Sequence, residues 1–250
     1  DIEIGSEVAT YLRGETGASF GKVQRFFLKV FGVEVSRGGL ALGLQRVARK
    51  AEPTYESLLE AVRRSPAVYA DETGARMSGR PWWLWVFTTP DTTVYAQRPS
   101  RGFDVIEEIL GADFDGKIGH DGYAVYDRLL RAIHQQCLQH PLARIKEMLQ
   151  VAPRGARAFL KAVKRFIQDA LDLRDRYLAG EGSKHGLAVA RGRLGWRQDE
   201  LLSKGLRYGP NKTFQKHLRK HHNEWLTFLW YPGELEGTNW RGEQAVRPAV

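Results

Sequence analysis

Residues 66–136 read as a succession of short β-rich runs set between two long helical stretches. An apolar run at 67–70 is followed by β-rich stretches at 82–88 and 92–97, which a hairpin-like connection joins. A helix with a regular apolar face follows Ser100, then a fourth short strand at 117–120 and a helical pattern over 123–132. This order of strand, strand, strand, helix, strand, helix predicts an α/β fold, a mixed sheet with helices packed on it.

The segments on either side show helical periodicity. In residues 5–65 the apolar positions recur mostly three and four apart, Gly32 interrupts them, and Ser36 can cap a new helix that starts at Arg37. This is the outline of a helix-turn-helix, but any pair of packed helices gives it. The segment is therefore either a DNA-contacting unit or an ordinary helical lead-in. From residue 156 onwards the pattern is helical again.

The positive charge is concentrated in one part of the chain. Over 250 residues there are 38 Lys and Arg against 29 Asp and Glu, a net charge of +9. Residues 153–236 hold 17 of the basic and only 9 of the acidic residues, which is nearly the whole excess. Such a segment predicts attraction to nucleic-acid phosphates, although solvated helix faces would give a similar count. Its candidate DNA contacts are Lys212, Lys216, Arg219 and Lys220.

Several classes of protein are excluded or disfavoured. The longest unbroken apolar run, WWLWVF at 82–87, is far shorter than the roughly 20 residues of a membrane helix, so no membrane partner is expected. The single cysteine, Cys137, excludes an internal disulfide and a cysteine-cluster zinc site. No charged and then apolar leader follows Asp1, and no GxxxxGK[ST] loop is present. We therefore expect a cytoplasmic protein that uses no nucleotide cofactor.

Two carboxylates follow directly on predicted strands. Asp71 comes after the first strand and Asp121 after the fourth. Carboxylates at the ends of neighbouring strands can converge and hold a divalent cation through oxygen. Taken alone, an aspartate at such a place is more often a turn former or a helix cap.

Three sequence blocks resemble the insertion-sequence-66 family of DDE transposases. Residues 69–74 (YADETG), with 82–87 downstream, resemble the first catalytic block. Residues 120–126 (HDGYAVY) are similar to the second, and 236–248 (EGTNWRGEQAVRP) to the third. The blocks occur in the right order, and the resemblance covers most of the chain, including the lead-in.

The resemblance implies a ribonuclease-H-like fold with a helical insertion before the last catalytic helix. Asp71, Asp121 and Glu243 would then be the catalytic triad and would bind two Mg²⁺ ions, with Mn²⁺ able to substitute. The implied organisation is a helical lead-in at 1–65, the first part of the core at 66–152, the basic insertion at 153–236 and the glutamate helix at 237–250.

The spacing of the polar residues in the third block, 236–248, suggests a role for each of them. Asn239, Glu243 and Arg247 are four residues apart and share one face of a short helix. We expect Glu243 to close the metal site while Asn239 and Arg247 face a DNA phosphate. As alternatives, Arg247 forms a surface ion pair with Glu243, and Asn239 is only an N-cap. The commoner family version has an asparagine and an arginine where this chain has Trp240 and Gln244, so local DNA contacts are expected to differ.

Two further residues lie near the expected site. Cys137 and His140 have the spacing of half a zinc site, but no second cysteine pair exists. We expect Cys137 to end a buried fifth strand and His140 to begin a helix, from which it contacts DNA. Glu72 points away from Asp71 if the strand continues, so it is not expected to be a ligand.

By resemblance, the expected activity is metal-dependent cleavage of DNA at the ends of a mobile element and strand transfer into target DNA. The partner would be double-stranded DNA, bound by a homo-oligomer in the nucleoid of a bacterial cell. Relatives carry an additional N-terminal DNA- and zinc-binding portion and continue past the third block, so the chain is expected to be a fragment. Two alternatives stay open: a nuclease of the same fold that cuts without joining, and a non-catalytic DNA-binding remnant.

Overall fold

The chain forms two compact units, Asp1–Leu58 and Leu59–Val250. The computed structural model describes residues 2–77 and 79–247. Asp1, Ser78 and residues 248–250, which fall within the predicted lead-in, core and glutamate helix, lie outside the described residues.

The first unit is helical, as predicted. It contains α1 (Ile2–Gly14), α2 (Phe20–Phe31) and the first part of α3 (Arg37–Arg64). Gly32 ends α2 in the left-handed conformation with φ 67°, where a residue without Cβ is favoured. Ser36 caps α3, because its Oγ accepts a 2.9 Å hydrogen bond from the N–H of Gly39.

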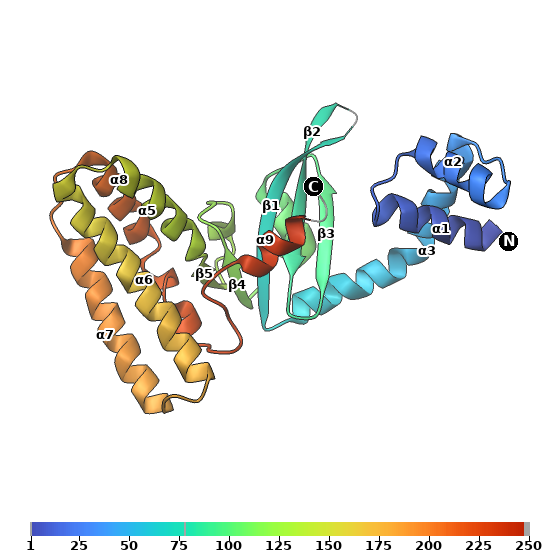
Figure 1. The fold of residues 1–250 in the computed structure, drawn as a ribbon. Helices are drawn as coiled ribbons and strands as arrows, with labels where there is room; N and C mark the ends of the chain where they lie inside the picture. Colours follow the sequence, from blue (N-terminus) through green and yellow to red (C-terminus); the bar gives the residue numbers. More distant parts are fainter. Residues whose placement is uncertain (1, 78, 248–250) are drawn as a thin grey trace. The chain divides into compact units, whose positions relative to one another are not determined.

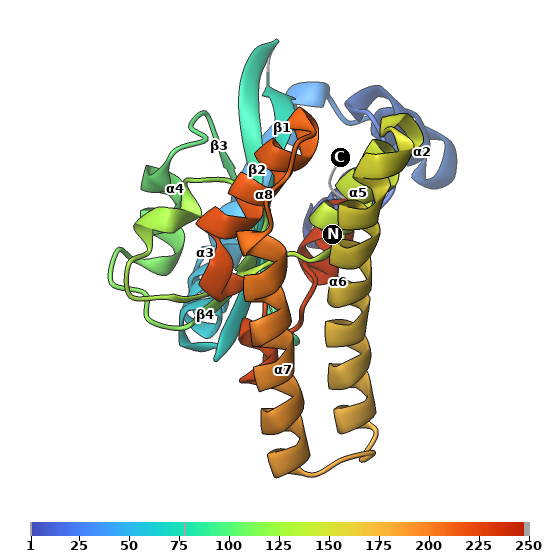
Figure 2. The same cartoon turned by 90° about the vertical axis from the view of Figure 1, so that its left-hand side faces the viewer.

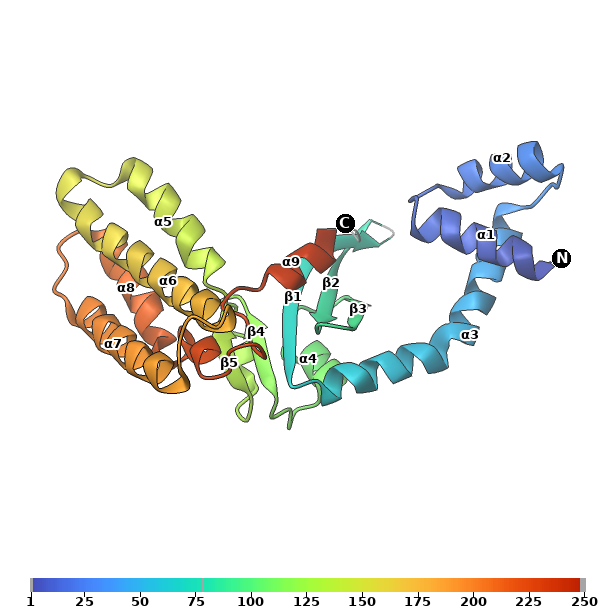
Figure 3. The ribbon, with the colours of Figure 1, turned by 60° about the horizontal axis from the view of Figure 1, so that its bottom comes forward.

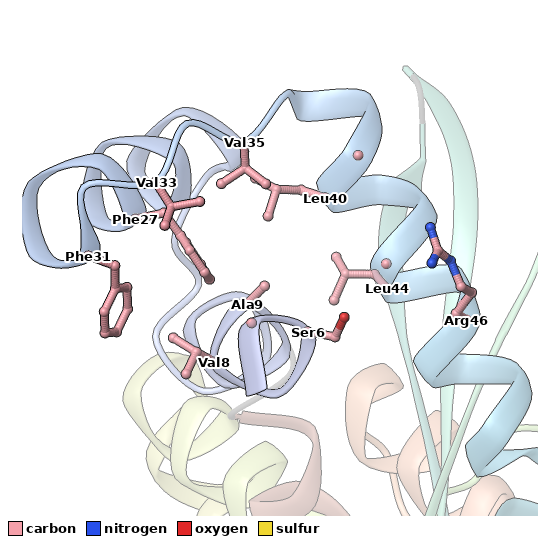
Figure 4. Close-up of a pocket in the computed structure, with 13 residues that line it drawn as sticks. Ser6, Val8, Ala9, Phe27, Phe31, Val33, Val35, Leu40, Leu44 and Arg46 are labelled. Carbon is pink, nitrogen blue, oxygen red and sulfur yellow. The ribbon is translucent and has the colours of Figure 1, made fainter. Parts of the chain in front are cut away.

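The core of this unit is small. It is built from Ala9, Val23, Phe27 and Leu40. Beside it lies a pocket of about 470 Å³, lined mainly by apolar side chains, which Figure 4 shows between α1, α2 and α3.

The second unit contains a five-stranded mixed sheet with the order β3-β2-β1-β4-β5 (Figure 1). The first three strands are antiparallel neighbours, whereas β1, β4 and β5 run parallel. The strands are β1 (Ala67–Met77), β2 (Arg80–Thr88), β3 (Thr93–Arg98), β4 (Lys117–His120) and β5 (Ile133–Gln136). The predicted α/β class with a mixed sheet is confirmed.

Two local predictions are wrong. The first strand does not end before Asp71 but continues to Met77, because β2 pairs with it from Tyr69 as far as Met77, whose partner is Arg80. The helix predicted over 123–132 is reduced to the 3₁₀ turn η1 (Tyr126–Arg128). There, Asp121 Oδ1 accepts a 2.9 Å hydrogen bond from the N–H of Tyr123 and favours a turn over a helix.

The two faces of the sheet are covered by different elements. Figure 3 shows α9 (Trp240–Val246) and α4 (Phe103–Leu110) on opposite sides of it, and α9 packs against β1 and β2. Because side chains alternate along a strand, Ala67 and Tyr69 of β1 share one face. Both belong to the hydrophobic core that the later helices form.

The later helices begin with α5 (Gln139–Val151), which belongs to the predicted first part of the core. The range predicted as the insertion, 153–236, contains η2 (Arg154–Ala156), α6 (Arg157–Leu178), α7 (Lys184–Ser203), α8 (Gly209–Lys220), η3 (His222–Glu224) and η4 (Thr227–Leu229). Figure 2 shows α6 and α7 side by side. The apolar side of α6 is buried and includes Phe159, Val163, Phe166, Ile167 and Ala170. None of the helices in the described residues combines the length and apolar character that a membrane crossing requires.

Candidate active site

Asp71 in β1 and Asp121 directly after β4 lie at the same level of two neighbouring parallel strands. Tyr69 of β1 is the register partner of Gly119 of β4, and each aspartate comes two residues later. Residues two apart on a strand point to the same face, so Asp71 points to the side of the sheet that carries Tyr69. Asp121, one residue past β4, lies close enough for its negative charge to act on Asp71. Both aspartates are partly buried. Asp121 follows directly on β4, as predicted.

The segment before α9 is hydrogen-bonded to β1 next to Asp71 and to the residues that follow β5. The side-chain amide of Asn239 donates a 2.8 Å hydrogen bond to the carbonyl of Ala70, and its backbone N–H lies 3.1 Å from Cys137 Sγ. Two residues earlier, Gly237 accepts a 2.9 Å hydrogen bond from the N–H of Leu138. Glu243 begins the regular helical bonding, since its N–H donates to Asn239 O at 3.0 Å. The partly buried glutamate is thereby brought to the side of β1 that carries Asp71.

The three carboxylates share one electrostatic environment. Burial, together with the negative charges of Asp121 and Glu243, raises the pKa of Asp71 to about 6. The N–H of Glu72 and the positive charge of His140 oppose this shift. Partly buried carboxylates that repel one another are stabilised by a divalent cation, and oxygen is the ligand that Mg²⁺ prefers. The residues present therefore fit a magnesium site.

A histidine and the cysteine complete the surroundings of Glu243. Cys137 Sγ lies 3.8 Å from Glu243 Oε1, and the ligand atoms of Cys137, His140 and Glu243 all lie within 4.8 Å of one another. A hydrogen bond with Cys137 raises the pKa of His140 to about 9 against the opposing effect of burial, and the charges of Asp121 and Glu243 act with it. His140 is thus cationic at neutral pH. Cys137 is buried directly after β5, and His140 lies in the first turn of α5, as predicted.

Glu72 lies on the opposite face from Asp71, as its place in the strand predicts. Its side chain is 2% exposed and accepts hydrogen bonds from Arg101 Nη2 and Tyr126 Oη, both at 2.8 Å. The guanidinium of Arg101 lies between the rings of Trp83 and Tyr123, at 4.4 and 4.1 Å from their centroids. This stack supports the turn after Asp121. Sequence reasoning missed Arg101, because its partners come from three separate segments.

The four predicted basic DNA contacts of the insertion lie on α8 and are all exposed. Lys220 forms a 2.7 Å ion pair with Asp127, and Arg219 donates to the carbonyl of Leu202. Within the described part of the chain, Lys212 and Lys216 have no acidic partner. These two lysines are one helical turn apart and form a free basic edge.

The two other predicted DNA contacts of the third block, Asn239 and Arg247, differ in their exposure to solvent. Arg247 is exposed at the end of α9, and no ion pair joins it to Glu243 among the described residues. Asn239 is only 1% exposed, and its amide faces β1. It precedes the helix without a side-chain capping bond, so its hydrogen bond positions α9 rather than capping it.

Comparisons with known proteins identify the family. The model of the Transposase IS66 family matches residues 16–250 and so spans all three carboxylates. The uncharacterized protein y4qI of Sinorhizobium fredii is 32% identical over 116 residues, which cover 40% of this chain and 21% of that protein. The matched segment thus spans about a fifth of the length of this curated relative. The family match confirms the resemblance seen in the sequence, and the chain belongs to the IS66 family of transposases.

Proposed function

We propose that the second unit is the catalytic region of a transposase, which cleaves DNA at element ends and transfers the strand to target DNA in the bacterial nucleoid. The register of Tyr69 with Gly119 carries this proposal, because Asp71 and Asp121 each come two residues after one of these partners and so stand at the same level of the sheet. The hydrogen bond from Asn239 to Ala70 adds Glu243 from a distant part of the sequence.

The strand order supports a ribonuclease-H-like assignment. Three antiparallel strands are followed by two parallel ones, with β1 in the centre of the sheet. Ligand sites of sheets with parallel strands form at the carboxyl ends of those strands. Asp121 lies at such an end, beside the continuing strand that carries Asp71.

In this proposal Asp71, Asp121 and Glu243 hold two Mg²⁺ ions, for which Mn²⁺ can substitute. When bound, such a pair activates the attacking oxygen and stabilises the leaving one. The protein contributes a fixed arrangement of carboxylates: β1 and β4 set two of them by register, and the bond between Asn239 and Ala70 sets the third. His140 adds a positive charge beside them that is suited to a phosphate oxygen.

The DNA is proposed to run along the exposed basic groups. Lys212 and Lys216 of α8 would contact phosphates, which position the duplex without reading its sequence. Arg219 and Lys220 contribute charge next to them, although each is also engaged within the protein. Arg247 would contact DNA at the end of α9. A homo-oligomer on paired element ends is proposed as the acting form.

The test is cleavage and joining of a labelled element end in the presence of Mg²⁺. Wild type is compared with Asp121→Asn, which removes the charge with little change in shape. Asp113→Asn is the matched control, since Asp113 is an exposed loop carboxylate whose side chain is 90% accessible. The proposal predicts joined product for wild type and for the control, and its loss in Asp121→Asn.

The other outcomes distinguish the alternatives. Metal-dependent cleavage without joined product would indicate a nuclease of the same fold. DNA binding with no cleavage, unchanged in Asp121→Asn, would indicate a DNA-binding remnant in which the carboxylates have no catalytic role.

A further inference from the structure

Two histidines meet behind the strand end that carries Asp121. His120 is the last residue of β4 and is fully buried, and His134 lies on the neighbouring strand β5. Their facing nitrogens, His120 Nε2 and His134 Nδ1, are 2.9 Å apart. This pair is neither among the proposed Mg²⁺ ligands nor part of the basic edge of α8.

The outer nitrogens of both rings are engaged by backbone carbonyls. His120 Nδ1 lies at hydrogen-bond distance from Asp121 O, and His134 Nε2 lies 2.9 Å from Leu129 O. Carbonyl oxygens only accept, so both outer nitrogens must be donors. A neutral imidazole carries one N–H, which leaves a lone pair on each inner nitrogen. The two lone pairs then face each other, and this arrangement requires a positive centre between them.

A carboxylate completes the group from the helical insertion. Glu224, at the end of η3, has a carboxylate oxygen within 4.8 Å of a ring nitrogen of His120 and of a ring nitrogen of His134. Its Oε2 is held by Gln136 Nε2 at 2.6 Å and by His221 Nδ1 at 3.0 Å. A pocket of about 290 Å³, lined in part by His134 and Glu224, adjoins the group and gives a route for an ion.

We propose that His120 Nε2, His134 Nδ1 and the Glu224 carboxylate bind one divalent transition-metal ion of the Zn²⁺ class. Imidazole nitrogens favour such ions over Mg²⁺. Metal-bound histidines characteristically donate their outer N–H to a backbone carbonyl or a carboxylate, as both histidines do here. Zinc–nitrogen bonds of about 2.0–2.1 Å in tetrahedral geometry need the two nitrogens roughly 3.4 Å apart. The rings must therefore separate by a few tenths of an ångström.

Bound in this way, the ion would link the insertion to β4 and β5 directly beside Asp121. It is distinct from the proposed magnesium site in ligand type, because two of its three ligands are imidazole nitrogens and none is Asp71, Asp121 or Glu243. The proposal does not depend on the proposed function, since its test measures metal binding.

The experiment is a competition titration of the metal-free full chain with Zn²⁺ and a chromophoric chelator, with Mg²⁺ in excess. Wild type is compared with His134→Ala and with the near-isosteric Glu224→Gln, after circular dichroism has verified that each variant is folded. His222→Ala is the control, because His222 is a surface histidine that also faces a carboxylate, Asp199. Co²⁺ is then substituted for Zn²⁺, and the absorption spectrum reports whether sulfur is a ligand.

We expect one equivalent of Zn²⁺ per chain, bound at least about tenfold more weakly by each ligand variant and equally well by the control. The Co²⁺ complex should lack a thiolate charge-transfer band. The proposal is overturned by unchanged affinity in both ligand variants. A thiolate band that disappears in Cys137→Ala would also overturn it, by placing the ion with Cys137, His140 and Glu243. Absence of Zn²⁺ binding would mean that a shared proton joins the histidines.

Discussion

The amide of Asn239 donates a 2.8 Å hydrogen bond to the carbonyl of Ala70, so the residue before α9 is tied to the residue before Asp71. Because Asn239 is buried, this bond forms away from competing water. It fixes the start of the helix that carries Glu243 relative to the strand that carries Asp71. Asn239 therefore connects two carboxylates that are far apart in the sequence.

Asn239→Ala should reduce strand joining at least tenfold and lower the free energy of unfolding by about 1–3 kcal/mol, because it leaves a buried carbonyl without its donor. Urea denaturation and the joining assay measure the two effects. Asn223→Ala is the control, since Asn223 is exposed. Equal stability and equal joining in the two variants would show that the bond does not position the glutamate.

Gly242→Ala and Gly195→Ala should change stability in opposite directions. A Cβ on Gly242 would lie 2.7 Å from Asn239 Oδ1, so α9 or Asn239 must move. We expect a loss of about 1–3 kcal/mol. Gly195 lies within α7 with nothing within 4 Å of its added Cβ, so alanine should stabilise the protein by about 0.5–1 kcal/mol. Thermal unfolding of both variants checks this, and a loss of the same size in each would rule out the steric explanation.

Asp71→Asn should stabilise the metal-free protein at neutral pH. The pKa of Asp71 is raised from 3.8 to about 6, so the folded state favours the protonated carboxyl. Its stabilising contribution is complete below pH 3.8 and is lost as the pH rises through 6. Two pKa units correspond to about 3 kcal/mol at most, and partial exposure reduces the expected gain at pH 7 to about 1–2 kcal/mol.

Urea denaturation of wild type and Asp71→Asn at pH 4 and pH 7 measures this gain. The variant should be more stable at pH 7 and nearly equal to wild type at pH 4, and added Mg²⁺ should narrow the difference at pH 7. An equal difference at both pH values would mean that burial and charge at Asp71 are not its cause.

The paired variant Lys212→Ala/Lys216→Ala should weaken DNA binding and flatten its dependence on salt. Each lost phosphate contact lowers the slope of log K against log salt by about 0.9, so the pair should lower it by nearly 2. Lys184→Ala/Lys204→Ala is the matched control, because it removes two exposed lysines from the ends of α7. Equal slopes in the two double variants would show that the edge of α8 has no special part in binding.

How far the sequence predicts the site depends on how local each feature is. The strand at 117–120 and Asp121 after it were predictable, because a short apolar run ends at a turn-forming residue. The continuation of β1 past Asp71 was not, since residues 72–77 alternate poorly and extend only because β2 pairs with them. The 3₁₀ turn at 126–128 replaced the predicted helix for a local reason, because Asp121 Oδ1 accepts a hydrogen bond from the N–H of Tyr123.

Contacts between distant segments set the remaining parts of the site. Cys137 and His140 have a visible spacing, but Glu243, their neighbour in space, comes 106 residues after Cys137. Asn239 is a residue type that is common at the N-cap of a helix, and only the folded sheet brings its amide to the carbonyl of Ala70. The histidine pair has no sequence signal, because it depends on the pairing of β4 with β5 and on η3.

Metal-specific rescue tests most directly whether Asp121 holds a catalytic ion. In Asp121→Cys a soft thiolate replaces a hard carboxylate. Mg²⁺ binds poorly to a thiolate, whereas Mn²⁺ accepts it better. The account predicts that joining of an element end is lost with Mg²⁺ and recovered at least tenfold with Mn²⁺, whereas Asp113→Cys behaves as wild type with both ions. Undiminished joining by Asp121→Cys with Mg²⁺, or a loss that Mn²⁺ does not relieve, would contradict it.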